Sequence, residues 1–167
     1  VLFHPTSIYT QYGIGDLGKK ARLFVDKLKK SGMKLWQILP LGPTGYADSP
    51  YQSLSAFAGN PLLISPEKLI DLELVDEEEV EKSFQDLETY KKEWDSEYKI
   101  DYETVRKAKY QVFEKAFAKF TKQKSNFSEL WEKFEEFKTT QSYWLNDFVL
   151  FFTLKKEHAM KSWLEWP

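Results

Sequence analysis

The distribution of glycine constrains the possible folds of this chain more than any other feature of the sequence. All seven glycines fall at or before Gly59, and residues 60–167 contain none. Glycine serves turns and tight loops and weakens helices, so the first part should hold short elements joined by irregular loops, and the second should be helical. We therefore expect two parts, residues 1–65 and a helical subdomain over residues 66–167.

Before this boundary the pattern predicts a strand, a helix and a second strand. Residues 1–3 are a short apolar candidate strand. Residues 17–31 repeat apolar side chains on one helical face, with Asp16 as a candidate N-cap and Gly32 as the stop. Residues 35–39 form an apolar run that suits a strand buried on both faces. This order predicts a right-handed parallel crossover, and hence an α/β fold class.

After the boundary every segment has the pattern of a helix. Ser65, Pro66 and Glu67 combine a cap, a proline at the first helical position and an acidic first turn. Further helices are expected over residues 76–90, from Asp101 to Phe120, over 128–137 and over 143–156. Their Lys and Glu residues lie opposite apolar stripes, as is typical of solvated helix faces.

Composition excludes several classes of protein. A net charge of -2 and a pI near 5.8 provide no overall basic field, so nucleic acid is not an expected partner. The chain has no cysteine, which excludes disulfides and thiolate metal sites and fits a cytoplasmic protein. No apolar run approaches the roughly 20 residues of a membrane span, so no membrane partner is expected.

The loop over residues 40–61 is the best candidate for a binding site. Glycines and prolines interrupt any regular period there, and loops of this length in compact domains are usually functional. Tyr46 and Tyr51 offer flat apolar faces with hydroxyl tips, among short polar side chains that include Asp48, Ser49 and Gln52. Such a mixture suits the apolar face and hydroxyl rim of a sugar, although tyrosine-rich and serine-rich loops also form protein interfaces.

Two other motifs favour structural roles. Gly13 to Gly18 matches G-x-G-x-x-G, but it does not closely follow the first candidate strand, and the second one ends without an acidic residue. We therefore predict a tight turn entering a helix, and no nucleotide cofactor. His4 and His158 have no thiol or carboxylate at metal-ligand spacing, so no metal site is predicted.

Several segments together resemble the amylomaltases, the 4-alpha-glucanotransferases or disproportionating enzymes of glycoside hydrolase family 77. They are GIGDLG from Gly13, WQILPLGPTGYADSPYQ from Trp36 and SAFAGNP from Ser55. The resemblance covers the whole chain and is strongest before residue 65. It implies the first strands of a (β/α)8 TIM barrel, followed by a mostly α-helical insertion subdomain.

The resemblance also implies a function. Family members transfer segments of alpha-1,4-glucan to an acceptor glucan or glucose by a retaining double displacement. It implies that Ser49 and Tyr51 line donor-side sugar subsites, and that Tyr46 stacks on glucan at a second site. At a position where some members have an aromatic residue, this chain has Arg106. The catalytic carboxylates of the family lie further along the sequence, so none is expected in this chain, which we interpret as an N-terminal fragment without catalytic activity of its own. The expected partners are alpha-1,4-glucans and maltooligosaccharides.

Two other classes of function remain open. A non-catalytic alpha-glucan-binding module would keep the loop and need no catalytic acids. A helical protein-interaction domain would instead expose aromatic residues of the second part, such as Trp144 and Phe148.

Overall fold

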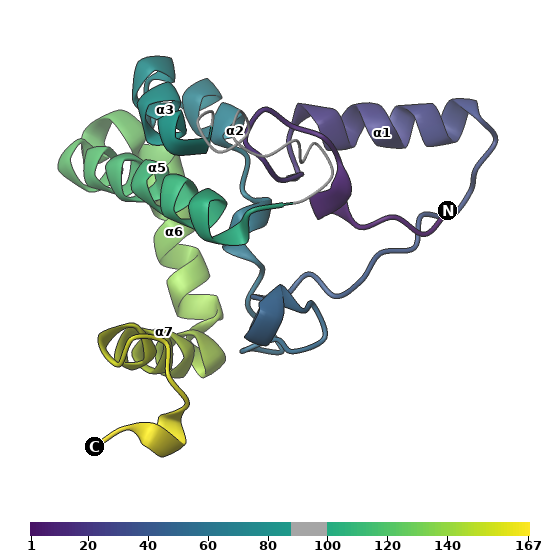
Figure 1. Ribbon diagram of the computed structural model, residues 1–167. Coiled ribbons are helices and arrows are strands. Elements are labelled where there is room, and N and C mark those ends of the chain that lie inside the picture. Colours follow the sequence, from purple (N-terminus) through teal and green to yellow (C-terminus); the bar gives the residue numbers. More distant parts are fainter. Residues whose placement is uncertain (88–99) are drawn as a thin grey trace.

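The computed structural model describes residues 1–87 and 100–167, which are mostly helical (Figure 1). The helices are α1 (Lys19–Lys30), α2 (Pro66–Asp71), α3 (Glu77–Ser83), α5 (Tyr102–Lys122), α6 (Ser128–Thr140) and α7 (Ser142–Glu157), with short 3-10 turns between several of them. In Figure 1, α2 and α3 lie beside α5, α1 extends away on the N-terminal side, and α6 leads to α7 near the C-terminus.

The core forms around one face of α5. That face buries apolar side chains every three or four residues, as the sequence pattern predicts, and α3, α2 and the segment before α1 pack against it. Its buried members are Tyr12, Ile14, Leu62, Leu74, Val75, Val80, Phe84, Leu87, Val105, Ala108, Val112, Ala116 and Phe120. Phe117, predicted for the same stripe, is instead 55% exposed.

Local signals place most helix ends correctly. The Asp101 carboxylate accepts hydrogen bonds from the backbone N–H groups of Glu103 and Thr104, and so caps α5. Gly32 has a φ of +75° just after α1, as a left-handed helix end requires. The helix predicted over residues 76–90 begins as α3 but is not continuous, because α3 ends at Ser83 with Phe84 as its C-cap; residues 88–90 lie outside the described part.

The prediction that Asp16 is the N-cap of α1 is wrong. Gly18 is the N-cap, and the Asp16 carboxylate accepts a hydrogen bond from the Gly18 N–H at 2.9 Å. The other carboxylate oxygen of Asp16 lies 3.6 Å from Lys109 Nζ on α5. The Asp16 carboxylate therefore lies between the Gly18 N–H and the ammonium group of Lys109, which belongs to a distant helix.

The two predicted strands do not form in the described residues. They are reduced to one parallel bridge between Leu2 and Gln37, with backbone bonds on both sides of it. Leu35, predicted to be buried on both faces, is 82% exposed. A parallel strand is stabilised by neighbouring strands and by layers on both faces, and the described residues place none beside this pair. The bridge confirms the parallel direction but not a sheet.

The second part of the chain packs its aromatic residues against one another. Trp144 and Phe148 are half-buried on α7, with ring centroids 6.0 Å apart, so the exposed aromatic surface of an interaction helix is not observed at these two residues. None of the helices within the described ranges combines the length and apolar character that crossing a membrane requires.

Candidate functional site

The loop over residues 40–61 is ordered by bonds within itself. The N–H of Asn60 donates to the carbonyl of Leu41 at 2.7 Å and so closes the base of the loop. Near its far end, the Ser55 hydroxyl accepts from the N–H groups of Phe57 and Ala58. Short serine side chains therefore replace regular secondary structure in satisfying this backbone.

A strained turn lies in the middle of the loop. Ala47 and Asp48, in the 3-10 turn Tyr46–Asp48, both have a φ of 54°, a left-handed conformation that costs a residue other than glycine about 1 kcal/mol or more. The Asp48 carboxylate accepts hydrogen bonds from the Thr44 hydroxyl at 3.2 Å and from the Arg106 guanidinium. These bonds, one of them from α5, hold the turn in its strained conformation.

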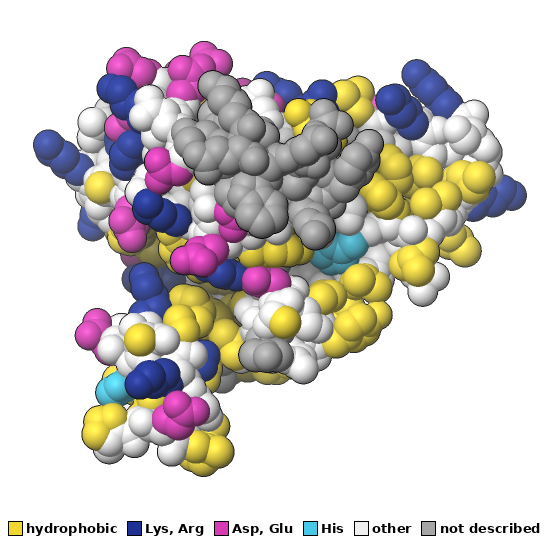
Figure 2. All heavy atoms as spheres, viewed as in Figure 1, with side chains coloured by type: hydrophobic (Ala, Val, Ile, Leu, Met, Phe, Trp, Pro, Cys, Tyr) yellow, Lys and Arg dark blue, Asp and Glu magenta, His cyan; other side chains and the backbone are white. Residues whose placement is uncertain are grey.

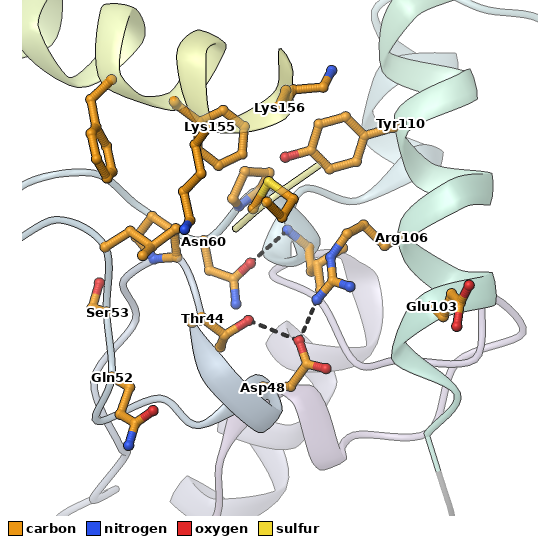
Figure 3. A pocket seen from close by; sticks show the side chains of 18 of the residues that line it. Thr44, Asp48, Gln52, Ser53, Asn60, Glu103, Arg106, Tyr110, Lys155 and Lys156 are labelled. Atoms are coloured by element: carbon orange, nitrogen blue, oxygen red, sulfur yellow. Dashed lines mark hydrogen bonds and ion pairs between the residues drawn. The ribbon is translucent and has the colours of Figure 1, made fainter. Parts of the chain in front are cut away.

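A cavity of about 1100 Å³ lies between the loop, α5 and the C-terminal end of α7 (Figure 3). In Figure 2 a hollow with hydrophobic side chains separates the lobe at the lower left from the rest of the molecule. Its lining includes Thr44, Asp48, Gln52, Ser53, Asn60, Glu103, Arg106, Tyr110, Phe151, Phe152, Lys155, Lys156, Met160 and Trp163. This volume is at the upper end of the range for small-molecule sites, and aromatic walls with a few polar groups are typical of them.

Most of the cationic groups around the cavity have partners. Lys155 Nζ donates to the carbonyl of Lys161 at 2.8 Å, and Lys156 Nζ lies 5.7 Å from the centre of the Tyr110 ring. Burial raises the pKa of Tyr110, so its hydroxyl stays protonated and can donate a hydrogen bond at neutral pH. The walls thus offer neutral hydroxyls, amides and rings, together with cationic groups that contact a carboxylate, a carbonyl or a ring.

A buried lysine fixes the end of the loop to α5. Lys109 is fully buried, and its ammonium group donates to the carbonyls of Leu62 at 2.6 Å and Ile64 at 2.8 Å. Desolvation lowers the pKa of Lys109 to about 8, and the nearby Asp16 carboxylate opposes that shift. The residues just after the loop are therefore held by a charged group inside the core.

Two of the three predicted site residues, Ser49 and Tyr51, lie on the loop but not in the wall of the cavity. The side chain of Tyr51 is 72% exposed, and its backbone N–H donates to the Ser49 hydroxyl at 3.3 Å. Neither residue lines the cavity, whereas Asp48, Gln52 and Ser53, noted in the sequence for the same loop, do. The backbone of Tyr46 begins the strained turn, but its side chain lies outside the described part of the structure.

Sequence reasoning missed what the helices contribute to the cavity. Tyr110 and Lys155 belong to segments interpreted as scaffold, and their patterns give no local sign of a site. Trp163 gave a weak indication of a site, because it follows the last long helix and so belongs to no apolar helix face. In the structure its side chain is 64% exposed.

The two motifs interpreted as structural behave as such. A Cβ on Gly15 would lie 2.0 Å from the carbonyl oxygen of Pro5, so that glycine permits close packing of the chain. His4 accepts a hydrogen bond from the Thr6 N–H and caps a 3-10 turn, and burial lowers its pKa. Within the described residues no group of His, Cys, Asp and Glu side chains could hold a metal ion.

Comparisons with known proteins identify the family to which this chain is related. A sequence profile described as 4-alpha-glucanotransferase matches residues 3–167. The 4-alpha-glucanotransferases of Thermus thermophilus and Aquifex aeolicus are each 41% identical to this chain, over 100% and 99% of it, and it spans 30% of each relative. The amylomaltase from Streptococcus agalactiae in complex with acarbose superposes with a TM-score of 0.75 at 32% identity, over 99% of this chain and 31% of that one. The chain therefore belongs to the 4-alpha-glucanotransferase family.

Proposed function

We propose that this chain supplies part of the glucan-binding surface of a 4-alpha-glucanotransferase, which moves segments of alpha-1,4-glucan to an acceptor glucan or glucose. The observation that carries the proposal is the ordered loop, which presents Tyr51 and Ser49 beside a large cavity with aromatic and hydroxyl-bearing walls. The family membership and the saccharide ligand of the solved relative support the same class of substrate.

Each loop residue has a proposed role. Tyr51 presents an exposed ring on which the apolar face of a pyranose can stack, and Ser49 offers a hydroxyl to its rim. We assign both residues to donor-side subsites. Tyr46 would stack on glucan at a second site, next to the cavity, where Arg106 stands in place of the aromatic residue of some relatives.

The chemistry of the reaction is proposed to lie elsewhere in the protein. Retention requires a nucleophilic carboxylate and an acid–base carboxylate about 5 to 5.5 Å apart. This chain spans 30% of its curated relatives, and we assign both carboxylates to the remaining length. In that arrangement residues 1–65 begin a (β/α)8 barrel and residues 66–167 form a helical insertion. The absence of cysteine favours a cytoplasmic location.

The proposal is tested in two steps. Isothermal titration calorimetry should detect binding of maltotriose or maltoheptaose to the 167-residue chain, and weaker binding to Tyr51→Ala. A polypeptide with the length of the relatives should convert maltotriose into glucose and longer maltooligosaccharides, whereas the 167-residue chain should not. Binding of neither sugar to the chain would refute the assignment of the loop, and disproportionation by the chain alone would refute the division of roles.

A further inference from the structure

A row of aromatic side chains leads away from the cavity along α7. Phe152 lines the cavity, its ring stacks on Phe148 with centroids 5.8 Å apart, and Phe148 lies 6.0 Å from Trp144. The spacing of four residues places the three rings on one face of the helix. From Trp144 to Phe152 the row covers about 12 Å of helix.

The row ends at a contact between α7 and the loop. Phe57 stacks on Trp144, with centroids 5.9 Å apart and planes at 22°, and meets Tyr143 nearly at a right angle at 5.6 Å. These rings differ in exposure, because Trp144 is half-buried while Phe57 is 61% and Tyr143 67% exposed. Phe57 thus rests on Trp144 and meets Tyr143 at its edge, and we call the two exposed rings, Phe57 and Tyr143, the aromatic ledge.

Hydrogen bonds hold Phe57 and the Trp144 ring on which it stacks in position. On the loop, the Ser55 hydroxyl accepts from the Phe57 N–H at 3.1 Å. On α7, the Trp144 indole N–H donates to the Gln141 side-chain oxygen at 2.8 Å. A preorganised ring surface loses little conformational entropy when a ligand stacks on it.

The shape and chemistry of the ledge favour a sugar chain. Exposed aromatic rings beside a binding cavity mark interaction sites, and the ledge combines flat apolar rings with the Tyr143 hydroxyl. The row of rings from Phe152 to Trp144 connects the ledge to the cavity. The ledge also shares a loop with Tyr51, which lies six residues before Phe57 in the sequence. An extended chain lying in the cavity would meet the ledge next.

We propose that the aromatic ledge is an additional subsite for alpha-glucan, which binds the part of a long chain that extends beyond the cavity. This inference rests on the proposed function, because it takes the ligand class from it. The ledge would give the protein a preference for longer chains without contacting the segment bound at Ser49 and Tyr51.

The test compares maltotriose and maltoheptaose on the 167-residue chain by isothermal titration calorimetry. The unaltered chain should bind maltoheptaose more tightly, and Tyr143→Ala should weaken maltoheptaose binding about threefold to tenfold while leaving maltotriose binding unchanged. Phe57→Leu, which keeps an apolar side chain but removes the flat ring, should have the same selective effect. Leu150→Ala is the matched control, because Leu150 is 61% exposed on α7 and lies outside the row.

The outcomes separate this inference from the proposed function. If the chain binds neither sugar, the proposed function fails and the inference fails with it. If the chain binds both sugars but Tyr143→Ala and Phe57→Leu bind maltoheptaose as the unaltered chain does, the ledge is not a subsite and only the inference is overturned. Thermal melts of all variants show whether a lost preference reflects a lost fold, and a variant with a lowered melting temperature is replaced by Tyr143→Leu.

Discussion

Arg106 on α5 forms an ion pair with Asp48 across 58 residues of sequence, and so ties the helical part of the chain to the strained turn of the loop. Asp48 precedes Ser49 directly, and Tyr51 follows two residues later. The conformation in which the loop presents both side chains therefore depends on a residue of a distant helix.

Removing that ion pair should loosen the loop. Arg106→Ala leaves Asp48 half-buried without its cationic partner, which should cost about 1 kcal/mol because the pair is partly exposed. Hydrogen exchange should be faster at the amides of residues 44–53, and maltotriose should bind more weakly. Lys82→Ala is the matched control, because its pair with Glu78 is mostly exposed and lies away from the cavity, and it should change neither measurement. Equal effects of the two variants would contradict the role of Arg106.

Relieving the left-handed turn should stabilise the protein. Ala47→Gly replaces a residue at a φ of 54° with one that adopts this conformation without a Cβ clash, and should raise the free energy of unfolding by about 0.5–1 kcal/mol. Ala118→Gly, on an exposed position within α5, should lower it by about 1 kcal/mol. Urea denaturation measures both changes, and destabilisation by Ala47→Gly would show that the turn is not strained.

The stability of the protein should depend on pH through Lys109. Burial lowers its pKa to about 8 from 10.5, so above pH 8 the unfolded chain binds more protons at this residue than the folded chain does. The free energy of unfolding should therefore rise from pH 8 to about 9.5, by at most about 1.4 kcal/mol per pH unit. Tyr12, Tyr102 and Tyr110 have raised pKa values, which oppose this trend only closer to pH 10.

Variants of the buried pair isolate this contribution. Lys109→Met should abolish the rise and cost about 3 kcal/mol at neutral pH, because it leaves Asp16 buried without its cationic partner. The double variant Lys109→Met with Asp16→Asn keeps an acceptor for the Gly18 N–H and removes the unpaired charge, so it should be more stable than the single variant. If the free energy of unfolding of Lys109→Met still rises with pH, the rise comes from other titratable groups.

Tyr51 should affect binding and not stability. Because its side chain is 72% exposed, Tyr51→Ala should change the free energy of unfolding by less than about 0.5 kcal/mol. It should weaken maltotriose binding about tenfold, which corresponds to the loss of one stacking contact of about 1.4 kcal/mol. Tyr9→Ala, at another exposed tyrosine, should leave binding unchanged. A large loss of stability in Tyr51→Ala would indicate a packing role instead.

The sequence predicted the elements that depend on local interactions. The spacing of Val105, Val112 and Phe120, with Asp101 in front, defined α5 because a helix forms its hydrogen bonds within itself. The strand around Leu35 was wrong because a strand depends on neighbours that its own sequence does not specify. The glycines and prolines of residues 40–61 indicated the loop, the family resemblance predicted a role for Tyr51 that remains a prediction, and the comparisons confirmed the family.

The parts of the site that sequence reasoning missed depend on contacts between distant segments. Asp16 has the sequence position of a helix N-cap, but its carboxylate lies beside Lys109 on another helix, which the local sequence does not indicate. The wall that Tyr110 and Lys155 form exists only because α7 folds back toward the loop. Neither residue belongs to a motif, so periodicity and spacing could not assign them.

The anchoring of the loop by Lys109 has a mechanical consequence. On the return side, the fully buried ammonium group of Lys109 donates to the carbonyls of Leu62 and Ile64, which belong to the 3-10 turn Pro61–Leu63 and its C-cap. On the entry side, the chain leaves a short pairing at Gln37, next to the solvent-exposed Leu35. On heating, the entry side of the loop should therefore lose order before the return side, once the hydrogen bond from the Asn60 N–H to the Leu41 carbonyl breaks.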